Sequence, residues 1–123
     1  MEDYYTSLTE IGATLILSVP SKLDDQGIEA MTEAVLERAH GRRFSGAILD
    51  FSALRIMDSF EFSAYIRASK ALELMGIRVC WTGLSPSSVI TIMDSEMDLY
   101  KTSIQTAVNL EEGLDLLRGD HVR

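Results

Sequence analysis

The chain is short of cysteine and of basic residues, and it has no long hydrophobic run. Its only cysteine, Cys80, excludes an internal disulfide and a zinc site built on several thiolates. Nineteen acidic and eleven basic residues give a net charge of −8. Because nucleic acids and anionic membranes are bound by clustered Lys and Arg, neither is an expected partner. No stretch approaches the roughly 18 apolar residues of a membrane span, and the N-terminus does not resemble a secretory signal.

The remaining composition is that of an ordinary folded domain. A hydrophobic content of 46% and a charged content of 24% exclude a disordered, collagen-like or low-complexity chain. A length of 123 residues suits one hydrophobic core and is too short for two. We therefore expect a single cytoplasmic domain over residues 1–123, with a core from about 10 to 118, a short acidic N-terminal end and a frayed C-terminal end.

Short apolar runs alternate with amphipathic segments along the chain. The runs of strand length are 14–19, 46–51, 77–82 and, more weakly, 103–108, and a first edge strand is expected within 4–11. Helical spacing follows four groups of residues that favour helix starts: Asp24-Asp25, Asp58, Ser85-Pro86 and Asn109. Apolar strands separated by helices predict an α/β fold, with a mostly parallel sheet of four to five strands and about four helices.

The spacing of apolar residues also predicts which side chains of each helix face the sheet. In the segment after Asp58 these are Phe62, Tyr65, Ile66, Ser69 and Leu72. In the short segment after Pro86 they are Val89, Ile92 and Met93.

The chemistry of common enzyme families is missing from the sequence. No phosphate-binding loop of an NTPase, no dinucleotide-binding glycine motif and no serine-hydrolase elbow is present. His40 and His121 are expected to be solvated rather than catalytic or metal-binding, and Cys80 is expected to be a buried structural thiol. A phosphorylated receiver domain has an acid pair after its first strand and its phosphoacceptor after its third. Here only one helix separates Asp24-Asp25 from Asp58, so this arrangement is not matched. The sequence therefore predicts no catalytic residue, no cofactor and no metal site.

One junction between a strand and a helix stands out. The run ending at Phe51 leads through a short connection into Asp58-Ser59, where Asp58 is suited to cap the helix and Glu61 to complete a capping box. Ser59 is then expected in the first helical turn with an outward hydroxyl, beyond the carboxyl end of a strand. From residue types alone, an ordinary helix start with no further role is the favoured interpretation.

The second interpretation is a phosphorylatable switch at Ser59. A phosphate at a helix N-terminus meets backbone N–H groups and the positive end of the helix dipole, so the helix can persist. It adds about −1.5 to −2 charges beside Asp58 and Glu61. A partner docked against a neutral hydroxyl and an apolar rim of Phe60 and Met57 would then be repelled.

The order of these features resembles that of STAS domains, the fold of anti-sigma-factor antagonists, and in particular the single-domain stressosome scaffolds of the RsbS type. The similar stretches, spread over about residues 10–118, are Leu23-Asp24-Asp25-Gln26, Ile56-Met57-Asp58-Ser59-Phe60, Met75-Gly76, Thr82-Gly83-Leu84-Ser85-Pro86 and Leu110-Glu111-Glu112-Gly113-Leu114. Asp-Ser-Ser-Gly is usual in the sporulation-type antagonists, whereas here Phe60 and Glu61 follow Ser59.

This resemblance implies a non-enzymatic scaffold that co-assembles with RsbR-type sensor paralogues into a large particle. The particle would sequester an RsbT-type switch serine/threonine kinase, which phosphorylates the serine matching Ser59 and then leaves, and a phosphatase would reset the scaffold. Thr91 lies near the position of a second phosphoacceptor in the sensor paralogues, although a surface threonine without that role is favoured. An antagonist that binds an anti-sigma kinase directly, and a small enzyme that uses Ser59 with Asp58, are the alternatives.

Overall fold

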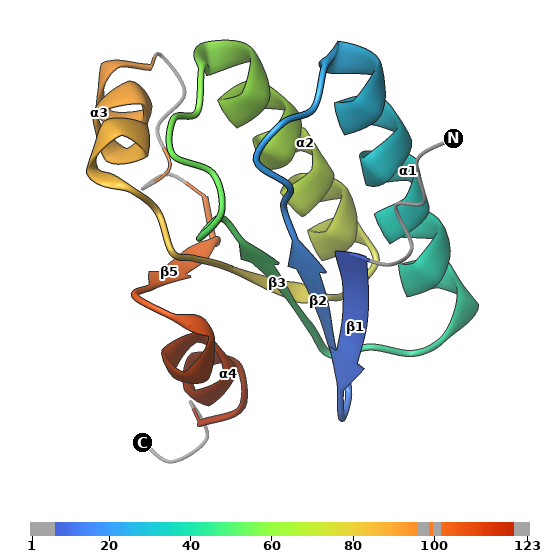
Figure 1. The fold of residues 1–123 in the computed structure, drawn as a ribbon. Helices are drawn as coiled ribbons and strands as arrows, with labels where there is room; N and C mark the ends of the chain where they lie inside the picture. The colour runs from blue at the N-terminus through green and yellow to red at the C-terminus, as the bar shows by residue number, and fades with distance from the viewer. Residues whose placement is uncertain (1–6, 96–98, 100–101, 120–123) are drawn as a thin grey trace.

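The computed structural model describes residues 7–95, 99 and 102–119. The expectations for residues 4–6, for His121 and for the two chain ends lie outside these residues. Nine elements follow one another (Figure 1): β1 (Leu8–Ile11), β2 (Thr14–Ser18), α1 (Asp25–Gly41), β3 (Gly46–Asp50), α2 (Ser59–Leu74), β4 (Arg78–Thr82), α3 (Pro86–Asp94), β5 (Gln105–Ala107) and α4 (Leu110–Gly119).

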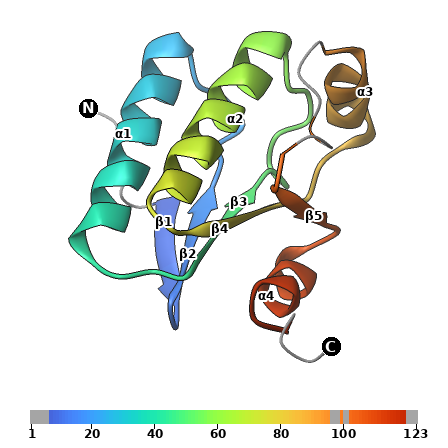
Figure 2. The ribbon, with the colours of Figure 1, turned by 180° about the vertical axis from the view of Figure 1, so that it is seen from behind.

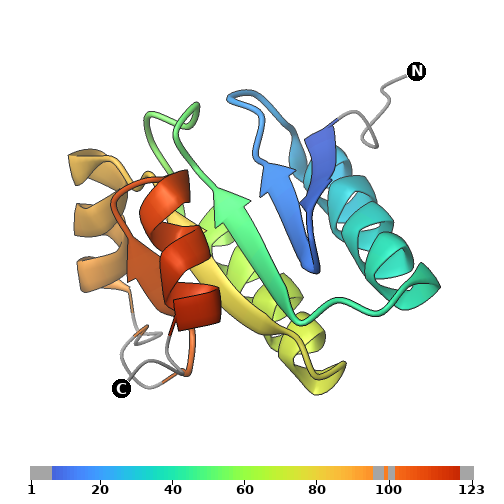
Figure 3. The ribbon, with the colours of Figure 1, turned by 90° about the horizontal axis from the view of Figure 1, so that it is seen from below.

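The strands form one sheet in the order β1-β2-β3-β4-β5, in which only β1 is antiparallel to its neighbour. Helices α1, α2 and α3 lie on one face of this sheet and α4 lies on the other (Figures 1 and 2). Seen from the side of α4, that helix lies over β3, β4 and β5 (Figure 3). The predicted fold class, a mostly parallel α/β sheet, is confirmed.

The two faces of the sheet carry cores of unequal size. The larger core lies under α1 and α2 and centres on Trp81, whose ring packs against Phe51 and Phe62 and whose Nε1 donates to Ser69 Oγ at 2.9 Å. The smaller core lies under α4 and consists of Ile16, Ile48, Cys80 and Leu117. The larger core therefore supplies most of the apolar burial that stabilises the fold.

The absence of a side chain at Gly113 lets helix α4 pack closely against the sheet. A Cβ atom at this position would lie 2.8 Å from Thr82 Cγ2 and 3.3 Å from Ile48 Cδ1. The order Asn109-Leu110-Glu111-Glu112 predicts a capping box at the start of α4, and one of its two bonds differs. Asn109 Oδ1 accepts from Glu112 N–H as predicted, but the Glu112 carboxylate accepts from Val108 N–H instead of from Asn109 N–H.

The predicted inward faces are confirmed for one helix and wrong for another. All five residues predicted to face the sheet from α2 are buried. In α3, Ile92 packs against the larger core, but Val89 is 39% exposed and Met93 is 72% exposed. The buried residue of α3 is Ser88, because this short helix is tied by Ser85 to the loop before α2 and packs beside α2, which leaves Val89 and Met93 on its outer side.

Leu49 offers a test of the core because it lies in the central strand β3, between Leu17 and Trp81, and is almost fully buried. We expect Leu49→Ala to lower the free energy of unfolding by about 2–5 kcal/mol, since truncation removes buried apolar surface and leaves a cavity. Leu74→Ala is the matched control, because Leu74 is 90% exposed. Urea denaturation of both variants measures the difference, and an unchanged midpoint for Leu49→Ala would contradict this placement.

Candidate functional site

The loop from β3 to α2 is anchored by three apolar side chains. Phe51, Leu54 and Met57 are buried in the larger core, and Leu54 N–H donates to Phe51 O at 2.9 Å. The Phe51 ring packs edge-on against Tyr65 of α2, with 5.2 Å between the ring centroids. The loop therefore enters α2 from a fixed direction, and the residues between its anchors are left at the surface.

A second anchor is polar and lies where β3 and β4 end. Asp50 Oδ1 accepts from Ser52 Oγ at 2.7 Å, from Ser52 N–H at 3.3 Å and from Thr82 Oγ1 at 3.0 Å. Gly83 packs against this group with a positive φ of 73°, and a Cβ atom there would lie 2.3 Å from Ser52 Oγ. Only glycine therefore fits at this turn without displacing Ser52.

The start of α3 is tied to the same loop. Ser85 caps α3 by accepting from Ser88 N–H at 3.1 Å, and its hydroxyl donates to Arg55 O at 2.7 Å. The sequence predicted the cap but neither the bond to Arg55 nor the Asp50 anchor. The bonds from Thr82 to Asp50 and from Ser85 to Arg55 join residues 32 and 30 positions apart, and the spacing of residues within one segment carries no signal for them.

The loop delivers Ser59 to the first position of α2. Asp58 caps the helix: its Oδ1 accepts from Glu61 N–H at 2.8 Å, while Glu61 Oε1 accepts from Asp58 N–H at 2.9 Å. This is the predicted capping box, and Ser59 is exposed as predicted. The two carboxylates satisfy each other's backbone donors, so the helix start is stable without any bond to the Ser59 hydroxyl.

The apolar rim beside Ser59 differs from the prediction. Met57 is fully buried because it fills the core beneath the loop, so it cannot form part of the rim. Its neighbour Ile56 takes that place with 66% of its surface exposed, and Phe60 is 41% exposed as the next residue after Ser59. Along the chain, Ser59 is therefore flanked by two exposed apolar residues.

The surroundings of Ser59 are anionic. Helices α1 and α2 run side by side and begin at the same edge (Figure 1), which brings Asp25 into the electrostatic field of Glu61. Burial raises the pKa of Glu61 above its ordinary value, the charges of Asp58 and Asp25 raise it further, and the hydrogen bond from Asp58 N–H opposes this. Burial, with a smaller contribution from Glu61 and Asp58, also raises the pKa of the Tyr65 hydroxyl well above its usual range.

The other candidate residues named in the sequence analysis lie on elements other than α2. Thr91 is half-buried in the middle of α3. His40 is exposed in the last turn of α1, fifteen residues after Asp25, which corresponds to about 22 Å along the helix. Cys80 is buried under α4, and burial raises its thiol pKa to about 11, so its thiolate is scarce at neutral pH.

The part of the chain that the structure describes contains neither a metal-binding cluster nor a membrane-spanning helix. No group of three or more His, Cys, Asp or Glu residues there could hold a metal ion. No helix among the same residues is long and apolar enough to cross a bilayer.

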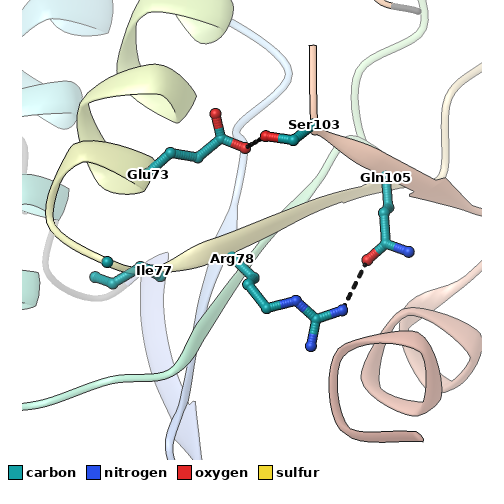
Figure 4. A pocket seen from close by; sticks show the side chains of 6 residues that line it. Glu73, Ile77, Arg78, Ser103 and Gln105 are labelled. Carbon is teal, nitrogen blue, oxygen red and sulfur yellow. Dashed lines mark hydrogen bonds between the residues drawn. The ribbon is translucent and has the colours of Figure 1, made fainter. Parts of the chain in front are cut away.

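A shallow depression of about 410 Å³ lies at the amino end of β4, away from Ser59 (Figure 4). The side chains lining it bond to one another, since Ser103 Oγ donates to Glu73 and Arg78 donates to Gln105 Oε1 at 3.3 Å. Arg78 also donates to Leu117 O at 2.7 Å, at the end of α4. These polar groups therefore hold β4, β5 and α4 together rather than converging on a ligand.

Comparison with known proteins agrees with this architecture. The family model for the STAS domain matches residues 5–111, so the chain belongs to the STAS-domain family. No curated protein matches the chain at a stringent significance threshold.

Three solved structures are similar over almost the whole chain. A serine-to-glutamate variant of RsbS from Moorella thermoacetica is 28% identical, with a TM-score of 0.83 and coverage of 94% of this chain and 97% of that one. A chain from a structure of the stressosome is 30% identical, with a TM-score of 0.81 and coverage of 91% of this chain and 96% of that one. The unphosphorylated anti-sigma-factor antagonist SpoIIAA shares the fold at 20% identity, with a TM-score of 0.72 and coverage of 91% and 95%. The chain is thus a STAS protein similar to those of stressosomes.

Burial and the neighbouring carboxylates make the stability of the protein depend on pH through Glu61. Because the folded state raises the Glu61 pKa above 4.5, it disfavours the charged form. That destabilising contribution is absent below pH 4.5, where the carboxyl group is protonated in both states, and is complete once the pH exceeds the raised pKa.

We therefore expect Glu61→Gln to gain stability relative to the wild type as the pH rises from 4 to 7. Glutamine keeps a side-chain oxygen for Asp58 N–H but carries no charge. Urea denaturation of the two proteins at both pH values measures the gain. A difference that shrinks as the pH rises would contradict the assigned direction of the Glu61 pKa.

Proposed function

We propose that the protein is a non-enzymatic, phospho-regulated scaffold of a bacterial stress-signalling complex of the stressosome type. It binds and sequesters a switch serine kinase, and phosphorylation of Ser59 releases that kinase. The observation that carries this proposal is the exposure of Ser59 at the first position of α2, directly after a loop that is anchored in the core. The similarity to RsbS and to a stressosome structure supports it.

Phosphorylation of Ser59 would change the surface and keep the fold. The first turn of α2 is already capped by Asp58 and Glu61, so the helix does not depend on the serine hydroxyl. A phosphate would add about −1.5 to −2 charges to a patch that already holds Asp25, Asp58 and Glu61. A partner that tolerates the neutral serine would then face a strongly anionic surface and dissociate.

The proposed partners follow from the same similarity. They are RsbR-type sensor paralogues that build the assembly with this chain, an RsbT-type serine/threonine kinase, and a phosphatase that resets Ser59. Thr91 is a candidate second phosphoacceptor of lower rank, because it is only partly exposed in the middle of a helix. We place this signalling complex in the cytoplasm.

A catalytic role for Ser59 is disfavoured by the distance to a base. A nucleophilic serine needs a proton acceptor within hydrogen-bond reach. His40 lies at the far end of α1, about 22 Å along the helix from the edge that carries Ser59.

Variants at Ser59 test the switch directly. We expect Ser59→Ala to bind the kinase in the presence of ATP without releasing it, whereas the wild type becomes phosphorylated and dissociates. Ser59→Asp should release the kinase only partly, because one charge replaces about two. Ser87→Ala is the matched control, since Ser87 is also an exposed serine in the first turn of a helix. Phosphopeptide mapping and a pull-down measure both steps, and release of the kinase from Ser59→Ala at the wild-type rate would refute the switch.

The size of the assembly separates a scaffold from an antagonist that binds an anti-sigma kinase alone. We expect this chain and an RsbR-type paralogue to elute together from gel filtration as a particle far larger than a dimer. Each protein run alone provides the control. Elution of the mixture as separate monomers or dimers, with the kinase still bound to this chain, would favour the direct antagonist.

A further inference from the structure

One hydroxyl group joins the start of α3 to the loop that leads into α2. Ser85 is half-buried, and its Oγ lies 2.7 Å from Arg55 O in that loop. The same Oγ accepts from Ser88 N–H at 3.1 Å, which caps α3. Figures 1 and 2 show α3 beside this loop. A single side chain therefore begins one helix and holds the loop that precedes another.

The direction of these bonds follows from the number of protons. A carbonyl oxygen only accepts, so the one proton of the Ser85 hydroxyl lies in the bond to Arg55 O. The hydroxyl oxygens of Ser85 and Ser88 are 3.0 Å apart, and Ser88 is fully buried, so Ser88 supplies the proton of that bond. The proton and both lone pairs of the Ser85 hydroxyl are thus in use.

The bond to Arg55 O falls where the loop has little apolar contact. Leu54 and Met57 are buried, whereas Arg55 and Ile56 between them are exposed. The side chains of this exposed pair therefore add little packing, and a hydrogen bond to the backbone holds the pair in its place. Because this bond needs a hydroxyl proton, it depends on the chemical identity of residue 85.

The exposed pair directly precedes the residues that carry the candidate phosphoacceptor. Arg55 is three residues before Asp58, the N-cap of α2, and four residues before Ser59. The bond to Arg55 O thus restricts the path by which the chain reaches Asp58 and the direction in which α2 begins.

We propose that Ser85 is a positioning residue for Ser59 and acts through Arg55 O. This inference rests on the proposed function and deepens it, because it names a residue on another element that regulates the reaction at the same site. With the loop held, the Ser59 hydroxyl has fewer unproductive orientations when the phosphoryl group is transferred. Ser85 takes no part in the transfer itself.

The substitution Ser85→Asp separates the two duties of the hydroxyl. Aspartate is a good N-cap and accepts from Ser88 N–H, but its carboxylate has no proton to donate to Arg55 O. Ser87→Asp is the matched control, because Ser87 is exposed in the same turn of α3 and gains the same charge. Ser85→Thr is the conservative variant, since threonine keeps the hydroxyl and caps helices. Circular dichroism and thermal melting verify that all three variants are folded.

Hydrogen exchange on the free protein tests the loop without any kinase. The amides to follow are those of Leu54 and Asp58, because the N–H groups of both are hydrogen-bonded. We expect both to exchange about two- to tenfold faster in Ser85→Asp, the range that corresponds to the loss of one hydrogen bond. Ser87→Asp and Ser85→Thr should match the wild type. Unchanged exchange in Ser85→Asp, or equal acceleration in Ser87→Asp, would overturn the proposal.

Phosphorylation by the kinase tests the effect on Ser59. We expect kcat to fall by about two- to tenfold in Ser85→Asp with KM unchanged, because the serine is less well aligned while binding is intact. Ser87→Asp and Ser85→Thr should keep the wild-type kcat. A higher KM with unchanged kcat would place Ser85 in the kinase-binding surface and overturn the positioning role. If the wild type is never modified at Ser59, the proposed function fails instead, and hydrogen exchange still decides whether Ser85 holds the loop.

Discussion

The structure around Ser59 depends on the burial of one loop. Phe51, Leu54 and Met57 give their apolar surface to the same core as Trp81, and this fixes a segment that would otherwise be free to move. The polar contacts of Asp50 and Ser85 then hold the loop from its two sides. The exposure of Ser59 follows from this arrangement, because Met57 before the helix start and Phe62 after it are both buried.

The anchoring residues and the exposed residues are different, so the proposed switch at Ser59 would act without unfolding the protein. The side chains that hold the loop are buried, whereas Ile56, Ser59 and Phe60 are exposed. A negative charge added to the exposed group meets solvent and neighbouring carboxylates, not the core. A phosphate on Ser59 would therefore change the binding of a partner at the surface and leave the sheet beneath intact.

Much of this arrangement could be predicted from the sequence, for reasons that differ between elements. The cap at Asp58 and the buried stripe of α2 are local patterns, and both are confirmed. The predictions that Met57 is exposed and that Met93 is buried are both wrong. Burial in a loop or on a short helix depends on which distant parts of the chain pack there. The Asp50 anchor joins residues 32 positions apart, which no local pattern reports.

The unequal division of the two cores has a consequence for motion. Among the described residues, α4 packs in a cluster of four buried and four partly buried residues and is held by the bonds from Arg78, so it has less apolar area than the larger core with which to resist transient opening. We expect the amide protons of α4 to exchange with solvent sooner than those of the central strand β3. Transient opening is then expected on the face opposite α1 and α2. The loop that carries Ser59 is packed on the other face and would keep its conformation during this opening.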